Sequence, residues 1–341
     1  MSHKVLQDYD IAELKTMLAD MDEPSYRAVQ IFSKLAAGVG VSDMTDLPKT
    51  LRSKLIERFV TEPVRIDDCL ESKDGSKKFL FALHDGNIVE GVFMPHNYGN
   101  TACLSTQVGC RMGCAFCASG IDGKIRDLTA GEILAEAVQA AVYTGKRLDN
   151  VVLMGSGEPL DNYDNTAKFI RLINSREGVG LGQRNISLST CGLCDGIYRL
   201  ADDGFTVTLS VSLHATTDEN RRKIMPVANK YSIADIVRAA KYYFEKTGRR
   251  IIYEYALIKD NMSYFDVKRL AEITSGYSSH VNLIMLNKVR EKDVTGCTAA
   301  EAERFRDRIE KAGVSVTVRR SMGADIEGAC GQLRRRRLYN D

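Results

Sequence analysis

Short apolar runs separated by helix-like stretches dominate the chain from about residue 102 to residue 320. The runs are ACLSTQVG, NVVLMG, NISLST, VTLSVSL, IIYEYALI, HVNLIML and VSVTVRR, rich in β-branched residues and too short for helices. The stretches between them carry helix start signals, with capping boxes at Thr129 with Glu132 and Thr298 with Glu301, and an analogue at Ser232. Repeated βα units predict a parallel sheet, either open and doubly wound or curled into a barrel.

The first hundred residues follow a different pattern. Apolar residues recur at helical spacing, at Ile11, Leu14, Leu18, Val29, Phe32, Leu35, Leu51, Leu55, Ile56 and Phe59. Further on, KKFLFAL and NIVEGVFM flank Asp85 and Gly86, a strong signal for a tight turn, which predicts a β-hairpin over residues 77–95. We therefore expect a helical accessory domain over residues 1–65, a β-hairpin linker over 66–100 and a catalytic core over 101–341.

Polar residues follow several of the predicted strands. In a (β/α) barrel, functional residues lie at the carboxyl ends of the strands, so this recurrence favours a barrel that binds a polar ligand there. Six or seven βα units fall short of the usual eight. We therefore expect an α/β fold with a partial TIM-like barrel. The strand-end residues are Gly157, Glu158, Ser189, Ser212, Leu213, His214 and Asn287.

Composition narrows the class of protein. The chain has 341 residues and a net charge of +2, so any basic surface for nucleic acid must be local. Nine cysteines in a chain of this length do not make a secreted disulfide scaffold. The sequence offers no apolar run of signal-peptide or membrane-span length. We expect a cytoplasmic enzyme with no membrane partner.

Three cysteines with the spacing C-x3-C-x2-C, at Cys110, Cys114 and Cys117, carry the most specific chemistry. Three thiolates can hold three irons of a 4Fe-4S cluster and leave the fourth iron open to another ligand, whereas electron carriers use four cysteines. Zinc is the alternative, but it normally takes four ligands in paired spacings. The spacing resembles the signature of the radical S-adenosyl-L-methionine (SAM) enzymes, in which the open iron binds SAM.

Five further strings extend this resemblance over nearly the whole chain. They are GCRMGCAFCAS, VVLMGSGEPLDN, ISLSTCGL, SLHATTDENRRKIMP and ADIEGACGQL, in this order. Together they resemble the dual-specificity RNA adenine-C2 methyltransferases. These radical SAM enzymes methylate carbon 2 of an adenosine in the peptidyl-transferase centre of 23S rRNA and of an adenosine beside the tRNA anticodon. The ACGQL string around Cys330 is absent from radical SAM enzymes in general.

The resemblance implies an indirect route to a carbon that has no lone pair. Cys330 takes a methyl group from one SAM by nucleophilic displacement and becomes S-methylcysteine. A radical formed from a second SAM removes a hydrogen from that methyl group, and the resulting carbon radical adds to the adenine. Cys103 then attacks the Cys330 sulfur, forming a transient disulfide and releasing the product. Glu90 matches a glutamate with a proton-accepting role.

The same resemblance assigns the seven strand-end residues named above to SAM binding. One departure lies at Asn287, where the family pattern VNLIPxNP loses both prolines and Lys288 follows the asparagine. Cys191 and Cys194 form a second C-x2-C. A redox or metal role is one interpretation, but because no second pair is nearby we favour small packing residues, as for Cys69 and Cys297.

The implied partners are 23S rRNA, tRNA and a flavodoxin- or ferredoxin-like reductase, and we expect a monomer. The N-terminal helices are a candidate RNA-binding domain. Local basic clusters at Arg221-Arg222-Lys223, Arg249-Arg250, Arg319-Arg320 and residues 334–337 are candidates for a phosphate-binding rim, or are solvated faces.

Three alternatives remain open at this stage. The closest is the sister activity that methylates carbon 8 of the ribosomal adenine and confers antibiotic resistance. It shares Cys103 and Cys330, but the proline of GEP, where the resistance enzymes have GEA, favours carbon 2. The others are a non-catalytic iron–sulfur or zinc RNA-binding protein and a glycyl-radical activase, for which Cys330 has no evident use.

Overall fold

The computed structural model describes residues 4–287, 289, 291–292 and 294–333. Its central feature is a set of seven mutually parallel strands, each paired with the next. They are β6 (Gly99–Cys103), β9 (Asn150–Leu153), β10 (Ile186–Thr190), β11 (Thr208–Ser212), β12 (Ile251–Leu257), β13 (Ser279–Met285) and β14 (Val316–Arg319). Six of the predicted runs, and the first residues of the seventh, thus lie in neighbouring strands of one sheet, as expected for repeated βα units.

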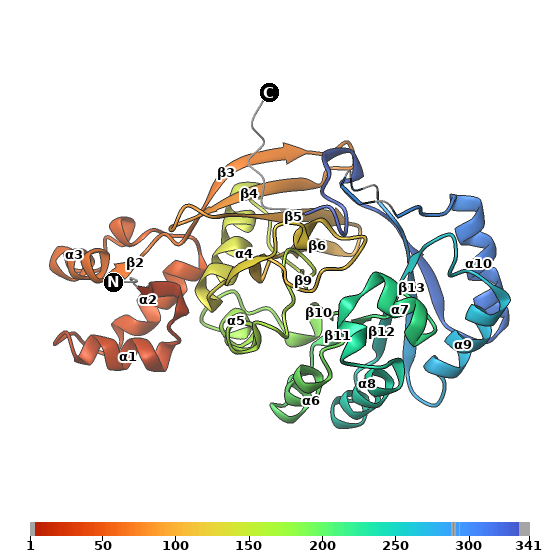
Figure 1. Cartoon of the computed structure of the whole chain (residues 1–341). Coiled ribbons are helices and arrows are strands. Elements are labelled where there is room, and N and C mark those ends of the chain that lie inside the picture. Colours follow the sequence, from red (N-terminus) through yellow and green to blue (C-terminus); the bar gives the residue numbers. More distant parts are fainter. Residues whose placement is uncertain (1–3, 288, 290, 293, 334–341) are drawn as a thin grey trace.

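Helices connect successive parallel strands and follow one another around the outside of the sheet (Figure 1). They are α4 (Ala130–Thr144), α5 (Tyr163–Asn174), α6 (Cys194–Asp202), α7 (Asp218–Ile224), α8 (Ile233–Thr247), α9 (Tyr264–Thr274) and α10 (Ala299–Lys311). The three predicted capping boxes are confirmed at the starts of α4, α8 and α10. Each box satisfies backbone N–H groups that the first helical turn leaves without partners.

Three antiparallel strands extend the sheet beyond β6. They are β3 (Val64–Glu71), β4 (Lys77–Leu83) and β5 (Ile88–His96). The predicted hairpin is β4 with β5, and its turn contains Gly86 at φ 84°. The full strand order is β14-β13-β12-β11-β10-β9-β6-β5-β4-β3, and within the described residues β14 and β3 are its edges. The predicted partial barrel is therefore confirmed, and the hairpin continues its sheet.

One predicted run is divided between two sheets. ACLSTQVG begins in β6 but ends in β7 (Gln107–Gly109), which pairs with β8 (Lys124–Asp127). The backbone N–H groups of Thr106 and Gln107 both donate to the carbonyl oxygen of Ser156, at 2.8 and 3.1 Å. These bonds turn the chain out of the main sheet, and the following loop carries the three spaced cysteines.

The N-terminal helices α1 (Ile11–Ala19), α2 (Arg27–Ala36) and α3 (Lys49–Arg58) gather at one end of the molecule (Figure 1). Most of the predicted apolar positions are buried, but Val29 and Ile56 are exposed. A short parallel pair, β1 (Lys4–Val5) with β2 (Phe59–Val60), closes this unit. Asp8 joins it to the core by accepting from the backbone N–H of Gly131 at 2.6 Å. The domain boundaries at residues 65 and 100 stay a prediction.

No helix in the described part of the chain has both the length and the apolar character needed to cross a membrane.

Candidate active site

Two adjoining cavities open among the parallel strands. The three-cysteine cavity, about 170 Å³ in volume, is lined by Cys110, Cys114 and Cys117. The two-cysteine cavity, about 670 Å³ in volume, is lined by Cys103 and Cys330. The residues that line both cavities, and so form their junction, are Met154, Ile284, Asn287, Arg319 and Cys330.

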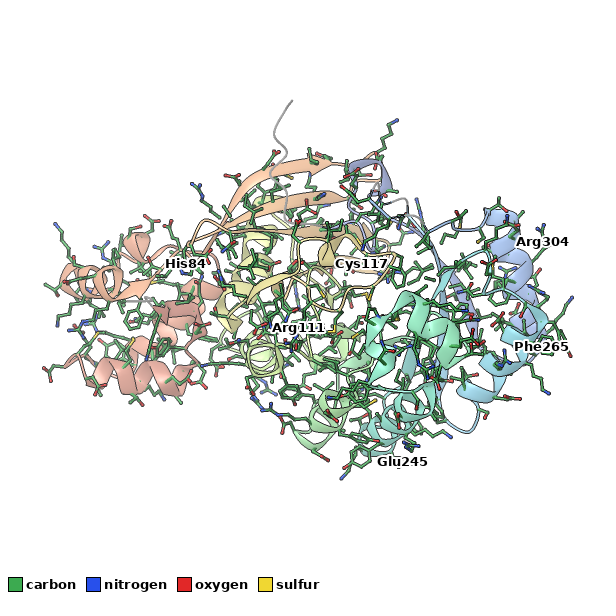
Figure 2. The ribbon with its side chains drawn as sticks, viewed as in Figure 1. His84, Arg111, Cys117, Glu245, Phe265 and Arg304 are labelled. Carbon is green, nitrogen blue, oxygen red and sulfur yellow. The ribbon has the colours of Figure 1, made fainter. Side chains whose placement is uncertain are left out.

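The loop between β7 and β8 presents the three spaced cysteines. Cys117 lies near the middle of the molecule in Figure 2. Burial raises the pKa of Cys110 to about 12 and also raises the pKa of Cys114, because desolvation disfavours a thiolate. The loop is fixed at two points: the N–H of Ala115 donates to the carbonyl of Ile224, and that of Ala118 donates to the carbonyl of Gly331. The second bond ties the cysteine loop to the segment that carries Cys330.

The donor set of the loop is three thiols, the number that can hold three irons of a 4Fe-4S cluster. No three His, Cys, Asp or Glu side chains of the described residues are close enough together to hold one metal ion. A cluster of four irons separates its thiolate ligands more widely than a single zinc does. The buried guanidinium of Arg221 partly offsets the rise in the pKa of Cys114, so a positive charge lies near the loop. Its Nη1 is buried with no hydrogen-bond partner among the described residues.

The GSGEP turn after β9 lies against the same cavity. Gly157 has φ 109°, and a Cβ there would lie 2.7 Å from the side chain of Gln107, so a side chain does not fit. Glu158 is buried, and its carboxylate accepts from the backbone N–H groups of Leu160 at 3.0 Å and Cys191 at 2.7 Å. Burial raises the pKa of Glu158 although these bonds oppose the rise. Both Gly157 and Glu158 line the cavity.

The next strand ends contribute Ser189, Ser212 and His214 to the cavity wall. His214 has φ 56° and accepts at Nδ1 from the backbone N–H of Ala256 at 2.9 Å. Burial, followed by the nearby Arg221, lowers the pKa of His214 to about 3, so the ring is neutral near pH 7. Leu213 differs from its neighbours, because its side chain belongs to the hydrophobic core and lines neither cavity.

Arg221 corrects one expectation about the basic clusters. Its side chain is 0% exposed, so it cannot bind phosphate on the surface. Instead it donates to the carbonyl of Cys191 at 2.6 Å and to those of Ser212 and Leu213 at 3.1 Å. Helix α7 thus places a buried guanidinium against carbonyl oxygens at the ends of two neighbouring parallel strands, β10 and β11. Its neighbour Arg222 is exposed, as a rim residue would be.

Of the other basic clusters, one lies away from the cavities and one lines a cavity. Arg249 donates to Thr208 Oγ1 at 2.9 Å and Arg250 to the carbonyl of Ser279 at 3.2 Å, both at the amino ends of strands. They therefore lie away from the strand ends that line the three-cysteine cavity, which does not support the first of the two interpretations, a phosphate-binding rim there. Arg319 and Arg320 do line the two-cysteine cavity. The cluster at residues 334–337, like Lys288, lies outside the described residues.

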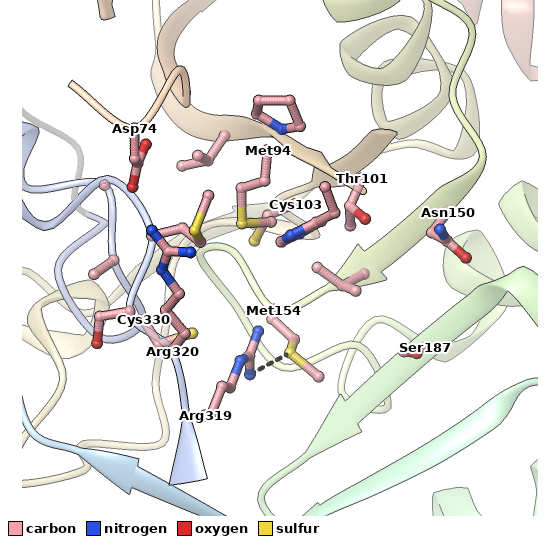
Figure 3. Close-up of a pocket in the computed structure, with 18 of the residues that line it drawn as sticks. Asp74, Met94, Thr101, Cys103, Asn150, Met154, Ser187, Arg319, Arg320 and Cys330 are labelled. Carbon is pink, nitrogen blue, oxygen red and sulfur yellow. Dashed lines mark hydrogen bonds between the residues drawn. The ribbon is translucent and has the colours of Figure 1, made fainter. Parts of the chain in front are cut away.

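The two-cysteine cavity brings Cys103, from β6, opposite the C-terminal segment that carries Cys330 (Figure 3). Burial, followed by the neighbouring Cys330, raises the pKa of Cys103 to about 12. All nine cysteines are described and are free thiols, so no disulfide joins this pair in the structure.

Arg319 lies at the junction of the cavities. Its Nη1 is 3.4 Å from the sulfur of Met154, drawn as a dashed line in Figure 3, and 3.8 Å from Oε2 of Glu254. The nearby Cys330 raises the pKa of Arg319, and Glu254 raises it further. Asn287 donates from Nδ2 to the carbonyl of Cys330 at 3.2 Å, so a predicted SAM contact touches the predicted methyl carrier.

Glu90 lies in neither cavity lining, although it shares one face of β5 with Val92, which does line the two-cysteine cavity. Its Oε1 is 2.9 Å from Nζ of Lys78, and both side chains are 2% exposed. Lys78 also donates to the carbonyl of Glu327 at 3.2 Å, in the segment that leads to Cys330. The sequence analysis missed Lys78 because a lysine in a hairpin usually faces solvent.

Glu254 and Met154 do line the cavities, and neither was predicted from the sequence. Glu254 is 3% exposed in the middle of β12, and burial raises its pKa. A charged residue inside the apolar run IIYEYALI was a signal that could have identified it, because burying a charge is costly unless the charge has a partner. Met154 at the junction gave no such signal, because methionine is an ordinary core residue.

Comparisons with known proteins agree with this geometry. A family model described as "Radical SAM superfamily" matches residues 104–267. A protein of Clostridium botulinum (strain Alaska E43 / Type E3) named "Probable dual-specificity RNA methyltransferase RlmN" is 48% identical over 335 residues, covering 97% of this chain and 96% of that protein. The chain belongs to this methyltransferase family. A protein of the same name from Clostridioides difficile (strain 630) is 49% identical, covering 97% of this chain and 98% of that one.

A solved structure supports the assignment at the level of the fold. The crystal structure of a radical SAM methyltransferase from Sphaerobacter thermophilus is 40% identical, with a TM-score of 0.94 over 98% of this chain and 100% of that chain. Family membership makes the activase and binding-protein alternatives unnecessary. Membership of the radical SAM family also implies SAM and an iron–sulfur cluster. The residues proposed to bind them line the three-cysteine cavity described above.

Proposed function

We propose that this chain transfers a methyl group from SAM to carbon 2 of adenosine in RNA, through an S-methylcysteine at Cys330. The observation that supports this most directly is the position of Cys330. It lines both cavities, with the three-cysteine loop on one side and Cys103 on the other. A residue that accepts a methyl group and later meets a second thiol must be reachable from both sites.

The proposed substrates are an adenosine of the peptidyl-transferase centre in 23S rRNA and an adenosine beside the tRNA anticodon. The names of the similar proteins, "Probable dual-specificity RNA methyltransferase RlmN", support an RNA substrate and a dual specificity, and the choice of these two adenosines follows the sequence resemblance. The protein would act as a monomer in the cytoplasm, with a flavodoxin- or ferredoxin-like reductase as electron donor.

Cys110, Cys114 and Cys117 would hold the 4Fe-4S cluster, which when bound supplies one electron for the reductive cleavage of SAM. Burial raises the pKa of Cys110 and of Cys114, so these two thiols are protonated in the free protein and cluster assembly must release their protons. The polar strand ends that line the cavity would bind SAM: Gly157, Glu158, Ser189, Ser212, His214 and Asn287. Leu213 would contribute only through its backbone.

The remaining roles belong to the two-cysteine cavity. Cys330 loses its thiol proton as its sulfur takes the methyl group, and Arg319 places a positive charge beside the sulfur. Asn287 holds the Cys330 backbone. Cys103 then forms a bond to the Cys330 sulfur as the bond from that sulfur to the RNA-linked carbon breaks. Glu90 would accept a proton, and its carboxylate lies 2.9 Å from Nζ of Lys78.

The decisive test is the mass of the tryptic peptide spanning residues 321–334 after anaerobic reconstitution with iron, sulfide and SAM. We expect one added methyl group on Cys330. An unmodified peptide, with the cluster intact by its absorption spectrum, would refute the proposal.

Cysteine variants make the assignment specific. Cys330→Ala and Cys110→Ala should each abolish RNA methylation without loss of the fold, whereas Cys297→Ala should retain it. Cys103→Ala should still carry the methyl group on Cys330 but accumulate a covalent RNA–protein adduct, visible as a band of reduced mobility on a denaturing gel. Nuclease digestion and chromatography of the product would distinguish carbon 2 from carbon 8. Substantial RNA methylation by Cys330→Ala would contradict the mechanism.

A further inference from the structure

The turn between β5 and β6 carries a stacked aromatic pair. β5 ends at His96 and β6 begins at Gly99, so Asn97 and Tyr98 form a two-residue turn. The rings of His96 and Tyr98 are stacked, with centroids 4.6 Å apart and planes inclined by 8°. Both residues line the two-cysteine cavity. Tyr98 is 75% exposed, the largest exposed fraction among the large apolar side chains of the described residues.

The fold gives no reason for tyrosine at this position. Two-residue turns favour small polar residues or glycine, not a large ring. A side chain that buries only a quarter of its surface gains little from the hydrophobic effect. Its stacking on His96 instead fixes the ring in one orientation before any ligand arrives. Such an ordered, exposed aromatic surface is the kind of platform on which proteins stack single-stranded nucleobases.

The place of Tyr98 in the cavity indicates which base would reach it. Tyr98 lines only the two-cysteine cavity, whereas Cys330 lies at the junction with the three-cysteine cavity. An adenine whose carbon 2 is at Cys330 would therefore fill the inner part of the cavity, and the adjacent nucleotide would be at the Tyr98 end. A base-modifying enzyme must draw its target out of the stack, which leaves the neighbouring base with an uncovered face.

Charge at the same end suits an RNA backbone. Arg320 is exposed and lines the cavity together with His96 and Tyr98. Burial lowers the pKa of His96, and Arg319 and Arg320 lower it further, so the imidazole is neutral and stacks without adding a charge. Asp74 also lines this part of the cavity, and it is engaged in accepting from the backbone N–H of Gly323 at 2.9 Å.

We propose that His96 and Tyr98 form a stacking platform for the unpaired base next to the target adenosine, with Arg320 contacting an adjoining phosphate. The proposal rests on the proposed function, because it assumes that an adenine enters this cavity. It adds a binding site for the flanking nucleotide, which neither the three cysteines nor the SAM contacts provide.

The first test separates RNA binding from the chemistry that precedes it. Tyr98→Ala, Tyr98→Phe and Tyr264→Ala are compared. Tyr264 is 71% exposed on α9, lines neither cavity and adjoins Phe265, which Figure 2 places at one edge of the molecule, away from Cys117. Methylation of Cys330 in the absence of RNA should be equal in all three variants and in the wild type.

The KM for RNA is then measured with a transcribed fragment of the peptidyl-transferase centre. Tyr98→Ala should raise this KM about 5- to 150-fold, the range expected for the loss of one base stack. Tyr98→Phe and Tyr264→Ala should leave KM unchanged.

The second test asks whether the lost contact is with a base. The same fragment is made with an abasic nucleotide on the 5′ side or on the 3′ side of the target. On one side, base removal should cost the wild type about as much as Tyr98→Ala does, and the two changes together should cost no more than either alone. Additive effects on both sides, or a Tyr98→Ala variant with wild-type KM, would overturn the platform. Failure of wild-type Cys330 to become methylated would instead refute the proposed function.

Discussion

Arg221 provides the sharpest test of how the strand ends are held in place. Its guanidinium donates to the carbonyls of Cys191, Ser212 and Leu213 at 2.6–3.1 Å, in a site that solvent does not reach. The substitution Arg221→Met keeps much of the side-chain volume but removes all three hydrogen bonds. The three acceptors would then be left in an interior where no described side chain replaces the donor.

The expected loss of stability is the difference between two large terms. A hydrogen bond from a charged donor contributes about 1.5–3 kcal/mol, so three would contribute roughly 5–9 kcal/mol. The variant is also relieved of the desolvation cost of burying a charge, and this offsets several kcal/mol of the loss. That cost is real here, because burial lowers the pKa of Arg221. We expect a net loss of about 2–4 kcal/mol in the free energy of unfolding.

The assay is urea unfolding of the apoprotein under reducing conditions, with Arg222→Met as the matched control. Arg222 is the exposed neighbour on the same helix, so its variant should remain within about 0.5 kcal/mol of the wild type. Arg221→Met should also bind SAM more weakly, because Ser212 lies at one of the strand ends that it holds. Equal urea midpoints for Arg221→Met, Arg222→Met and the wild type would refute the reasoning.

Two further predictions concern buried ionisable groups. Burial lowers the pKa of His214 to about 3, while an unfolded histidine titrates near 6.5. Between these values the unfolded chain binds more protons, so stability contributed by this group is complete above about pH 6.5 and is lost as the pH falls towards 3. Between pH 6.5 and pH 4.5 the free energy of unfolding of His214→Gln should therefore fall by about 2–3 kcal/mol less than that of the wild type. Urea unfolding at a series of pH values measures this difference. The same pH dependence in both proteins would contradict the prediction. Lys78→Met should cost about 3–5 kcal/mol by leaving Glu90 buried without its ammonium partner, and adding Glu90→Gln should recover part of that loss in a double-mutant cycle. Full additivity of these two substitutions would show that the ion pair does not couple them.

Local patterns in the sequence determined the elements and much of the chemistry. The β-branched runs and capping boxes act over a few residues, so strands such as β12 and helices such as α8 could be predicted without knowledge of their neighbours. The three cysteines of one loop are close in sequence and therefore close in space. The strand ends at Ser189, Ser212 and Asn287 also converge, because parallel strands bring their carboxyl ends to one edge of the sheet.

Which charged residues are buried could not be read from the local sequence and depends on the packing of the whole fold. Arg221 and Arg222 are adjacent in a basic run, yet helix α7 turns the first into the protein and the second to solvent. Arg319 and Met154, 165 positions apart, meet only through the tertiary structure. Lys78 and Glu90 both lie in the predicted hairpin, but Lys78 also contacts the carbonyl of Glu327, from a distant segment, and their burial is not visible in the local pattern. Cys103 and Cys330 are 227 positions apart in the sequence, and they line one cavity because β6 lies opposite the C-terminal segment. Burial of a charge is set by what packs around it, and those partners come from distant parts of the chain.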